Sequence, residues 1–450
     1  MPRIAIVAAC ALTVILAATT AVHAQRPVRT ICSIPAEDLA PAALHVKHTV
    51  EFYARTFPNV DFRHRLLGNG AITTRNYVSA WVLEGASNCN AMIGPGFSFL
   101  AIAMSPVIDG PWMDFSATSV ELSDKNQHPY FSRIIPTDEV GAKAASAAMI
   151  RLGWNTISVF CVNDAYGRSV AGGVAADLIR EGGGVEVQRC LPATTTRERV
   201  EAALDDIAAG SARVVFGAML PTQQTYRLFI QVAQERRLFE RMIFFFSEAM
   251  CSLADRTYAN LTGSLCATYT MNPTILQPFM QSYWQRDVAA INAELRTMGV
   301  TDPELYSNTT DIYAQLAHDA TLHVMSGMNA YVAAGSSTDE YLFIRQHISN
   351  GGTGRIELDA NGDRITADAA IFNAVPGAVE VDVGRVVGGT FSFVTPGQPV
   401  YLLGEYHTSD FPASVVATPA AAADSTSTTI VAIVASILGV AVVVVLIALF

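Results

Sequence analysis

The amino-acid sequence predicts an α/β fold built around mostly parallel sheets. From Asp138 onward, apolar strand-like runs recur about 28 residues apart, with stretches of helical length between them. Upstream, the apolar run 91–93 stops at a Gly-Pro-Gly turn before Ser98, and the next run ends in the hydroxyl-rich segment 116–118. In such sheets ligands bind at the carboxyl ends of strands, beside helix N-termini. The two hydroxyl-bearing segments therefore predict a site for a small anionic group.

The part of the chain before Asp138 predicts strands and helices in alternation. Strands are expected at 28–34, 62–67, 91–93 and 112–115, and helices at 38–57, at 72–87 and from Ser98 onward. The helix at 72–87 carries Trp81, Val82 and Leu83, which we expect on its buried side.

The part after Asp138 has the alternation that is typical of βαβ units. Helices are expected at 139–152, at 168–180, from a capping box at Thr195 and Glu198 to Ala209, and after Pro221. Strands are expected at 156–162, 185–188, 213–216, 242–245 and 265–270. Helices near 274–297, 309–332 and 337–348 and strands at 381–387 and 390–394 complete the prediction.

Length, charge and motifs bound the class of protein. With 450 residues the chain has room for two or three lobes. Its net charge of −11 does not favour a nucleic-acid partner. The turn at 94–96 lacks the third glycine of a dinucleotide loop, and the acidic segment 359–363 lacks the closing glutamate of a calcium loop, so it fits a tight Asn-Gly turn better. We find no catalytic constellation, and we expect a protein that is not an enzyme and has no cofactor or metal.

Both ends of the chain carry apolar segments that predict an extracellular protein on a membrane. Residues 1–24 fit a secretory signal peptide, with a small-residue cleavage site before Gln25. Residues 412–429 are rich in Ala, Ser, Thr and Pro, as in a stalk. The 21 uncharged residues 430–450 are long enough for a transmembrane helix, but a GPI-anchor signal is an alternative. We expect a location at the cell membrane in either case.

The cysteines agree with a secreted chain. Cys10 leaves with the signal peptide, and six cysteines remain, an even number that favours disulfides with fifteen possible pairings. We predict that neighbours in chain order pair, which gives Cys32–Cys89, Cys161–Cys190 and Cys251–Cys266. Asn260 and Asn308 begin acceptor sequences for N-glycosylation.

Linked motifs between residues 93 and 138 resemble a known family. They are IGPG-x-S ending at Ser98, SAT-S-x-x-LSDK at 116–125 and PYF-x-R-x-x-P-x-D at 129–138. A later segment, 351–364, resembles the family's GxTGxIxFDxxGDR motif. The order of these motifs resembles the receptor family ligand-binding region, the ectodomain shared by metabotropic glutamate, GABA-B and guanylate-cyclase receptors. The chain departs from the glutamate-receptor branch between 101 and 118, where it is a few residues shorter.

The resemblance covers roughly residues 28–405 and implies a type I periplasmic-binding-protein fold with two lobes. It implies a first lobe made of 25–137 and 270–364 and a second lobe made of 138–269 and 365–411. It also implies a dimer, homomeric or heteromeric, that forms through the first lobe.

The same resemblance assigns roles to residues of the cleft. Ser98 and Thr118, with Ser116 beside them, would bind the α-carboxylate of an amino-acid-like ligand. Asp138, Tyr166 and Glu248 would bind its ammonium group. Glu248 stands where the glutamate receptors carry aspartate, and we find no counterpart for the basic residues that hold a glutamate side chain.

Each of these residues also fits a structural role. Ser116 and Thr118 fit the end of a strand, and Asp138 fits a helix N-cap. Tyr166 fits a turn, and Glu248 fits a solvated strand end.

Three functions remain open at this stage. The first is the ectodomain of a signalling receptor that closes on a small molecule. The second is a peptide-binding ectodomain of the guanylate-cyclase kind. The third is a GPI-anchored protein that captures a ligand without signalling.

Overall fold

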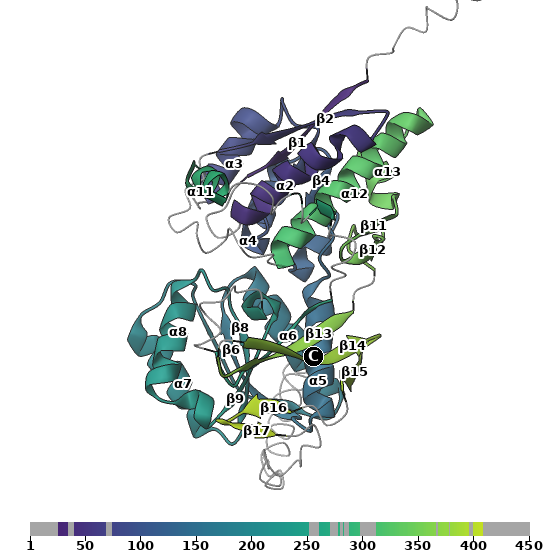
Figure 1. Ribbon diagram of the computed structural model, residues 1–450. Coiled ribbons are helices and arrows are strands. Elements are labelled where there is room, and N and C mark those ends of the chain that lie inside the picture. Colours follow the sequence, from purple (N-terminus) through teal and green to yellow (C-terminus); the bar gives the residue numbers. More distant parts are fainter. Residues whose placement is uncertain are drawn as a thin grey trace, which may run out of the picture.

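The computed structural model describes residues 26–407, apart from 35–39, 69–73, 252–260, 271–277, 280–281, 283–287, 298–311, 366–367, 378 and 396–398. The described residues form two lobes, one above the other in Figure 1, and each lobe is a sheet covered by helices. This is the two-lobed α/β architecture that the sequence predicts. The exact lobe boundaries given above stay predictions.

The first lobe contains a parallel sheet of five strands in the order β2-β1-β3-β4-β5. The strands are β1 (Val28–Ser33), β2 (Asp61–Leu66), β3 (Ala91–Ile93), β4 (Trp112–Asp114) and β5 (Phe131–Arg133). Helices α2 (Ala40–Tyr53) and α12 (Ile312–Ala334) pack side by side, and α2 contacts β1 and β2 while α12 contacts β3 and β4. Segments far apart in the sequence therefore cover this sheet.

Smaller elements complete the first lobe. They are η2 (Ala54–Thr56), α3 (Thr74–Ala80), the π-helical η3 (Trp81–Gly85), α4 (Ser98–Met104), η4 (Ser105–Val107), η5 (Val120–Ser123), α11 (Val288–Thr297), α13 (Glu340–Gln346) and the hairpin β11 (Ser349–Gly351) with β12 (Gly354–Ile356).

One prediction about η3 is wrong. Trp81 is buried and its indole N–H donates to the Val107 carbonyl, but Val82 and Leu83 are 53% and 78% exposed. Three consecutive residues of a helix point in directions about 100° apart, so they cannot all face the core.

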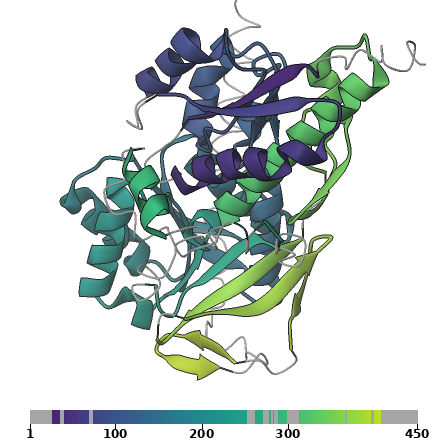
Figure 2. The same ribbon diagram turned by 45° about the horizontal axis from the view of Figure 1, so that its top comes forward.

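The second lobe contains a sheet of eight strands in the order β15-β14-β13-β10-β9-β8-β6-β7. The parallel strands are β6 (Thr156–Val162), β7 (Gly184–Leu191), β8 (Val214–Ala218), β9 (Ile243–Phe246) and β10 (Leu265–Tyr269). The antiparallel strands are β13 (Ala369–Val375), β14 (Val379–Val387) and β15 (Thr390–Phe393), which form one edge of the sheet in Figure 2. A hairpin of β16 (Val400–Leu402) and β17 (Glu405–His407) follows. The strand β13 was not predicted from the sequence.

Each face of this second sheet has its own hydrophobic core. Along β9, Ile243 and Phe245 face the core that contains α5 (Asp138–Arg151) and α6 (Ala165–Arg180). The alternate residues Phe244 and Phe246 face the core formed with α7 (Arg197–Ala209) and α8 (Gln224–Glu235). Both faces are buried, which explains why these strands read as continuous apolar runs. The short elements η6 (Leu238–Glu240) and α9 (Glu248–Cys251) flank β9.

The structure confirms the predicted pairing of the six cysteines. Cys32–Cys89 joins β1 to the segment before β3, Cys161–Cys190 joins neighbouring residues of β6 and β7, and Cys251–Cys266 joins α9 to β10. The Cα atoms of the pairs are 5.8, 4.4 and 5.7 Å apart.

Several predictions fall outside the part of the chain that the structure describes. They are the signal peptide 1–24, the stalk 412–429, the apolar segment 430–450 and the glycosylation acceptors Asn260 and Asn308. Among the described residues, none of the helices has the length and apolar character needed to cross a membrane.

Candidate functional site

The two hydroxyl-bearing segments of the first lobe meet at the carboxyl ends of β3 and β4. Ser98 begins α4, and its hydroxyl oxygen accepts a hydrogen bond of 3.1 Å from the Ser119 amide. Gly94 and Gly96 reach φ angles of 95° and 91°, values that favour glycine, so the turn needs both residues. Thr118 is fully buried, and its hydroxyl has no hydrogen-bond partner in the structure.

A buried carboxylate, which sequence reasoning missed, organises these two segments. Asp114 ends β4 and accepts hydrogen bonds from the amides of Gly96 at 3.0 Å, Ser116 at 2.8 Å and Ala117 at 2.7 Å. Burial raises the pKa of the Asp114 carboxyl, and the three amides and Arg133 act against that rise. The only signal in the sequence is an acidic residue inside an apolar run.

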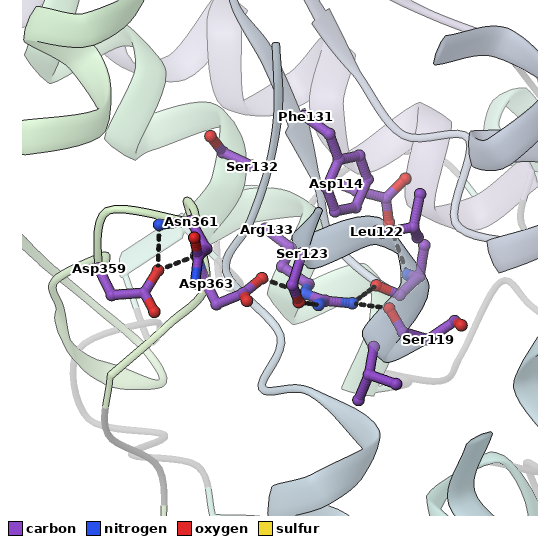
Figure 3. Close-up of polar contacts among 12 residues, drawn as sticks. Asp114, Ser119, Leu122, Ser123, Phe131, Ser132, Arg133, Asp359, Asn361 and Asp363 are labelled. Carbon is purple, nitrogen blue, oxygen red and sulfur yellow. Dashed lines mark hydrogen bonds and ion pairs between the residues drawn. The ribbon is translucent and has the colours of Figure 1, made fainter. Parts of the chain in front are cut away.

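A fully buried arginine, Arg133, also holds the segment that follows β4 (Figure 3). The Arg133 guanidinium donates to the carbonyls of Ala117 at 3.0 Å and Ser119 at 2.8 Å and to the Ser123 hydroxyl at 2.7 Å. Its Nε donates to Asp363 Oδ1 at 2.7 Å, so this cation is already paired within the protein.

Asp363 belongs to the turn that the sequence predicts at 359–363. Asp359 Oδ1 accepts from the amides of Asn361 at 2.8 Å and Asp363 at 2.9 Å (Figure 3). Gly362 has a φ angle of 70°. The carboxylates of this segment therefore stabilise a turn and an ion pair. Among the described residues, no group of three or more His, Cys, Asp or Glu side chains could hold a metal ion.

Asp138 lies where the chain enters the second lobe, and it is not the N-cap of α5. The N-cap is Thr137, and Asp138 is the first helical residue, with its amide bonded to the Thr118 carbonyl at 2.9 Å. Its carboxylate is buried, and neither oxygen has a hydrogen bond of good geometry. Burial raises the pKa of Asp138 to about 7, although the neighbouring hydroxyls of Ser169 and Thr118 act in the opposite direction.

Glu248 is a second buried carboxylate, so the prediction of a solvated strand end is wrong for it. It begins α9 directly after β9, and only 4% of its surface is exposed. Burial, followed by the charge of Asp138, raises the pKa of Glu248 to about 8. Two carboxylates that act on each other in a dry site leave at least one of them protonated near neutral pH.

Three tyrosines complete the surroundings of Glu248. Tyr166, in the first turn of α6, donates its hydroxyl proton to the Ser247 hydroxyl at 2.7 Å. The Tyr269 hydroxyl is buried without a partner, and Tyr269 packs into the core of the first lobe. After burial, the charges of Glu248 and Asp138 and the nearby Tyr313 raise the pKa of both Tyr166 and Tyr269. Tyr313 comes from α12, so both lobes contribute to this region.

The structure thus brings five of the six predicted residues into the region where the lobes meet, as buried side chains: Ser98, Thr118, Asp138, Tyr166 and Glu248. Ser116 is different, because it is only partly buried and its amide is bonded to Asp114. The residues that the sequence did not predict here are Asp114, Arg133, Tyr269 and Tyr313.

The fold and the arrangement of this site define a receptor-type ligand-binding domain. A protein-family model described as the receptor family ligand binding region matches residues 59–377, and the chain belongs to this family. Among its relatives is metabotropic glutamate receptor-like protein E of Dictyostelium discoideum, 25% identical over 302 residues that cover 64% of this chain and 35% of that protein.

Vertebrate relatives match a shorter part of the chain. Metabotropic glutamate receptor 6 of Rattus norvegicus and of Mus musculus is 34% identical over 106 residues, which cover 22% of this chain and 12% of the receptor. The chain therefore covers well under two thirds of the length of the curated relatives that it matches.

Proposed function

We propose that this chain is the extracellular ligand-binding domain of a membrane receptor and that it closes on a small molecule with an amine, an amino acid or a similar compound. The observation that carries the proposal is the pair of buried carboxylates Asp138 and Glu248, whose charged forms lack a compensating cation. Burying such groups is costly unless an ion pairs with them. A ligand ammonium group between the lobes supplies that charge.

The position of the site supports closure as the response to ligand. Thr118 and Tyr313 belong to the first lobe, whereas Asp138, Tyr166 and Glu248 belong to the second. A ligand that touches both sets favours the closed arrangement, because it gains the full set of contacts only there. As in the family, a dimer through the first lobe and a segment in the membrane would carry this change onward.

The relatives support a binding role rather than a catalytic one. Their printed names describe metabotropic glutamate receptors, and this chain matches only a part of each. Signalling by this chain, its position outside the cell and its membrane attachment are parts of the proposal. A peptide ligand and a GPI-anchored capture protein are the alternative hypotheses.

Thermal unfolding of the full chain, purified in mild detergent, tests the proposal against free amino acids and simple amines. A ligand present at about 100 times its Kd stabilises the folded state by about 2.7 kcal/mol and raises the Tm. We expect at least one compound to raise the Tm of the native protein and to lose this effect in Asp138→Asn.

Glu139→Gln is the matched control, because Glu139 is the exposed neighbour of Asp138 in the same helical turn. We expect this variant to respond to ligand like the native protein. If none of the compounds shifts the Tm, the proposed amine ligand is wrong, and a peptide ligand becomes the better hypothesis.

A further inference from the structure

We propose that the ligand of this site carries two ammonium groups and that its binding does not depend on a carboxylate, as in an aliphatic diamine. This inference rests on the proposed function and narrows the class of ligand. Two features of the site carry it: the surplus of negative charge, and the way in which the amides of the binding loops are already used.

The negative charge of the site has no counterpart among the cations beside it. Arg133 is the cation that acts on Asp138, but its guanidinium is bonded to Asp363 and to the carbonyls of Ala117 and Ser119. No cation contributes to the shift of Glu248. With one ligand ammonium group, one carboxyl ionises and pairs while the other stays protonated, whereas two ammonium groups allow both carboxylates to ionise and pair.

On the side of the site that would receive a ligand carboxylate, three loop amides are already bonded within the protein. The amides of Gly96, Ser116 and Ala117 point to Asp114, which acts as a built-in anion. A ligand carboxylate bound there would lie near another negative charge, that of Asp114. The remaining hydroxyl of Thr118 can accept a hydrogen bond from an ammonium group as readily as it can donate one.

Two separate places can each receive one ammonium group. The first lies beside the Asp138 carboxylate and the neighbouring Thr118 hydroxyl, whose buried oxygens make no hydrogen bond of good geometry. The second lies beside Gly141, one turn further along α5. A Cβ atom built on Gly141 would be 3.3 Å from the Tyr269 hydroxyl and 4.0 Å from Glu248 Oε2. The Tyr269 hydroxyl is also buried without a partner, so both places combine a carboxylate with an unused acceptor.

Four related compounds measure separately how the second ammonium group and the carboxylate of a ligand affect binding. Lysine and norleucine differ by the side-chain ammonium group, and 1,5-diaminopentane and pentylamine are the same pair without the carboxylate. We would measure their binding to the full chain by isothermal titration calorimetry. We expect each diamine to bind at least tenfold more tightly than its monoamine partner, and we expect removal of the carboxylate to weaken binding by less than threefold or to strengthen it.

The variant Glu248→Gln tests whether Glu248 causes the tighter binding of diamines than of monoamines. The amide keeps the shape of the side chain and removes its charge, so the variant should fold. We expect the advantage of 1,5-diaminopentane over pentylamine to fall below threefold, with pentylamine binding little changed. In the control Glu240→Gln, an exposed residue of the same lobe that pairs with Arg237, we expect the native preference.

The outcomes distinguish this inference from the proposed function. Norleucine binding as tightly as lysine, with both decarboxylated compounds weak, would overturn the inference and leave an amino-acid site. Binding of other amino acids but none of these four would have the same meaning. An absence of binding by all amino acids and amines would remove the proposed function and the inference together.

Discussion

Replacing Glu248 by glutamine should make the ligand-free protein more stable at alkaline pH and leave its stability almost unchanged at acidic pH. Burial and the charge of Asp138 raise the pKa of Glu248 from 4.5 to about 8. The folded protein therefore holds this proton at a pH at which the unfolded chain has released it. The favourable contribution of the protonated carboxyl is complete below about pH 4.5 and is lost as the pH rises through about 8.

The expected gain in the free energy of unfolding follows from the pKa shift of Glu248. A change of one pKa unit corresponds to about 1.4 kcal/mol, so the whole shift corresponds to about 5 kcal/mol. Part of that shift comes from Asp138, whose own pKa is also raised and which remains in the variant. We therefore expect Glu248→Gln to be about 2–4 kcal/mol more stable than the native protein at pH 8.5.

Chemical denaturation at a series of pH values between 4.5 and 8.5 measures this difference. The partly buried His64 and the buried His323, whose pKa values are lowered by desolvation, also titrate with pH, but they are the same in both proteins. Their contribution cancels when the two free energies of unfolding are subtracted. Glu240→Gln, at an exposed position, should show no pH-dependent difference.

A difference that stays constant or shrinks as the pH rises would refute this reasoning. It would mean that the Glu248 carboxylate is ionised in the folded protein at neutral pH. The site would then already contain a compensating charge, and the argument for a cationic ligand would lose its basis.

The remaining predictions concern the free energy of unfolding, measured by denaturant titration. Asp363→Ala leaves the buried Arg133 without its carboxylate and should cost about 3–5 kcal/mol; a loss under 1 kcal/mol would contradict the buried ion pair. Gly172→Ala, with no atom within 4 Å of the new Cβ, should stabilise α6 by about 1 kcal/mol, whereas Gly173→Ala, 2.7 Å from a Cβ atom of α5, should destabilise by about 1–3 kcal/mol. Equal effects of the two substitutions would show that α5 and α6 do not pack closely. Thr118→Val should change stability by less than about 1 kcal/mol, because the lost hydroxyl makes no hydrogen bond of good geometry, but it should abolish the ligand-induced shift in Tm.

Local patterns in the sequence predict the parallel part of the fold well. The strand at 156–162 is confirmed residue for residue, because both of its faces are buried and it reads as a continuous apolar run. The strand β13 was missed, since it pairs with β10 about a hundred residues earlier and contains a buried asparagine. Asn373 is satisfied by the carbonyls of Ser264 and Tyr401, and these partners cannot be inferred from neighbouring residues.

The candidate site was predicted in part for a similar reason. The resemblance to the receptor family identified Asp138 and Glu248, because the motifs that carry them keep their spacing along the chain. Nothing in the sequence indicated that Asp114 would bond to three amides, because that role depends on where two separate turns come together. Tyr269 was missed because it ends an ordinary buried strand, and only its neighbours in space make its hydroxyl part of the candidate site.

Arg133 connects the binding loop to the crossings between the lobes. Its guanidinium holds the carbonyls of Ala117 and Ser119 on either side of Thr118, and its Nε holds Asp363 in the segment that returns to the second lobe. Its backbone amide also donates to the Gly362 carbonyl at 2.9 Å. The buried cation cannot release one of these partners without a cost of several kcal/mol, so the contacts hold the loop around Thr118 firmly in the first lobe. One side chain therefore holds the loop around Thr118 against the ends of the two segments that lead from the first lobe into the second.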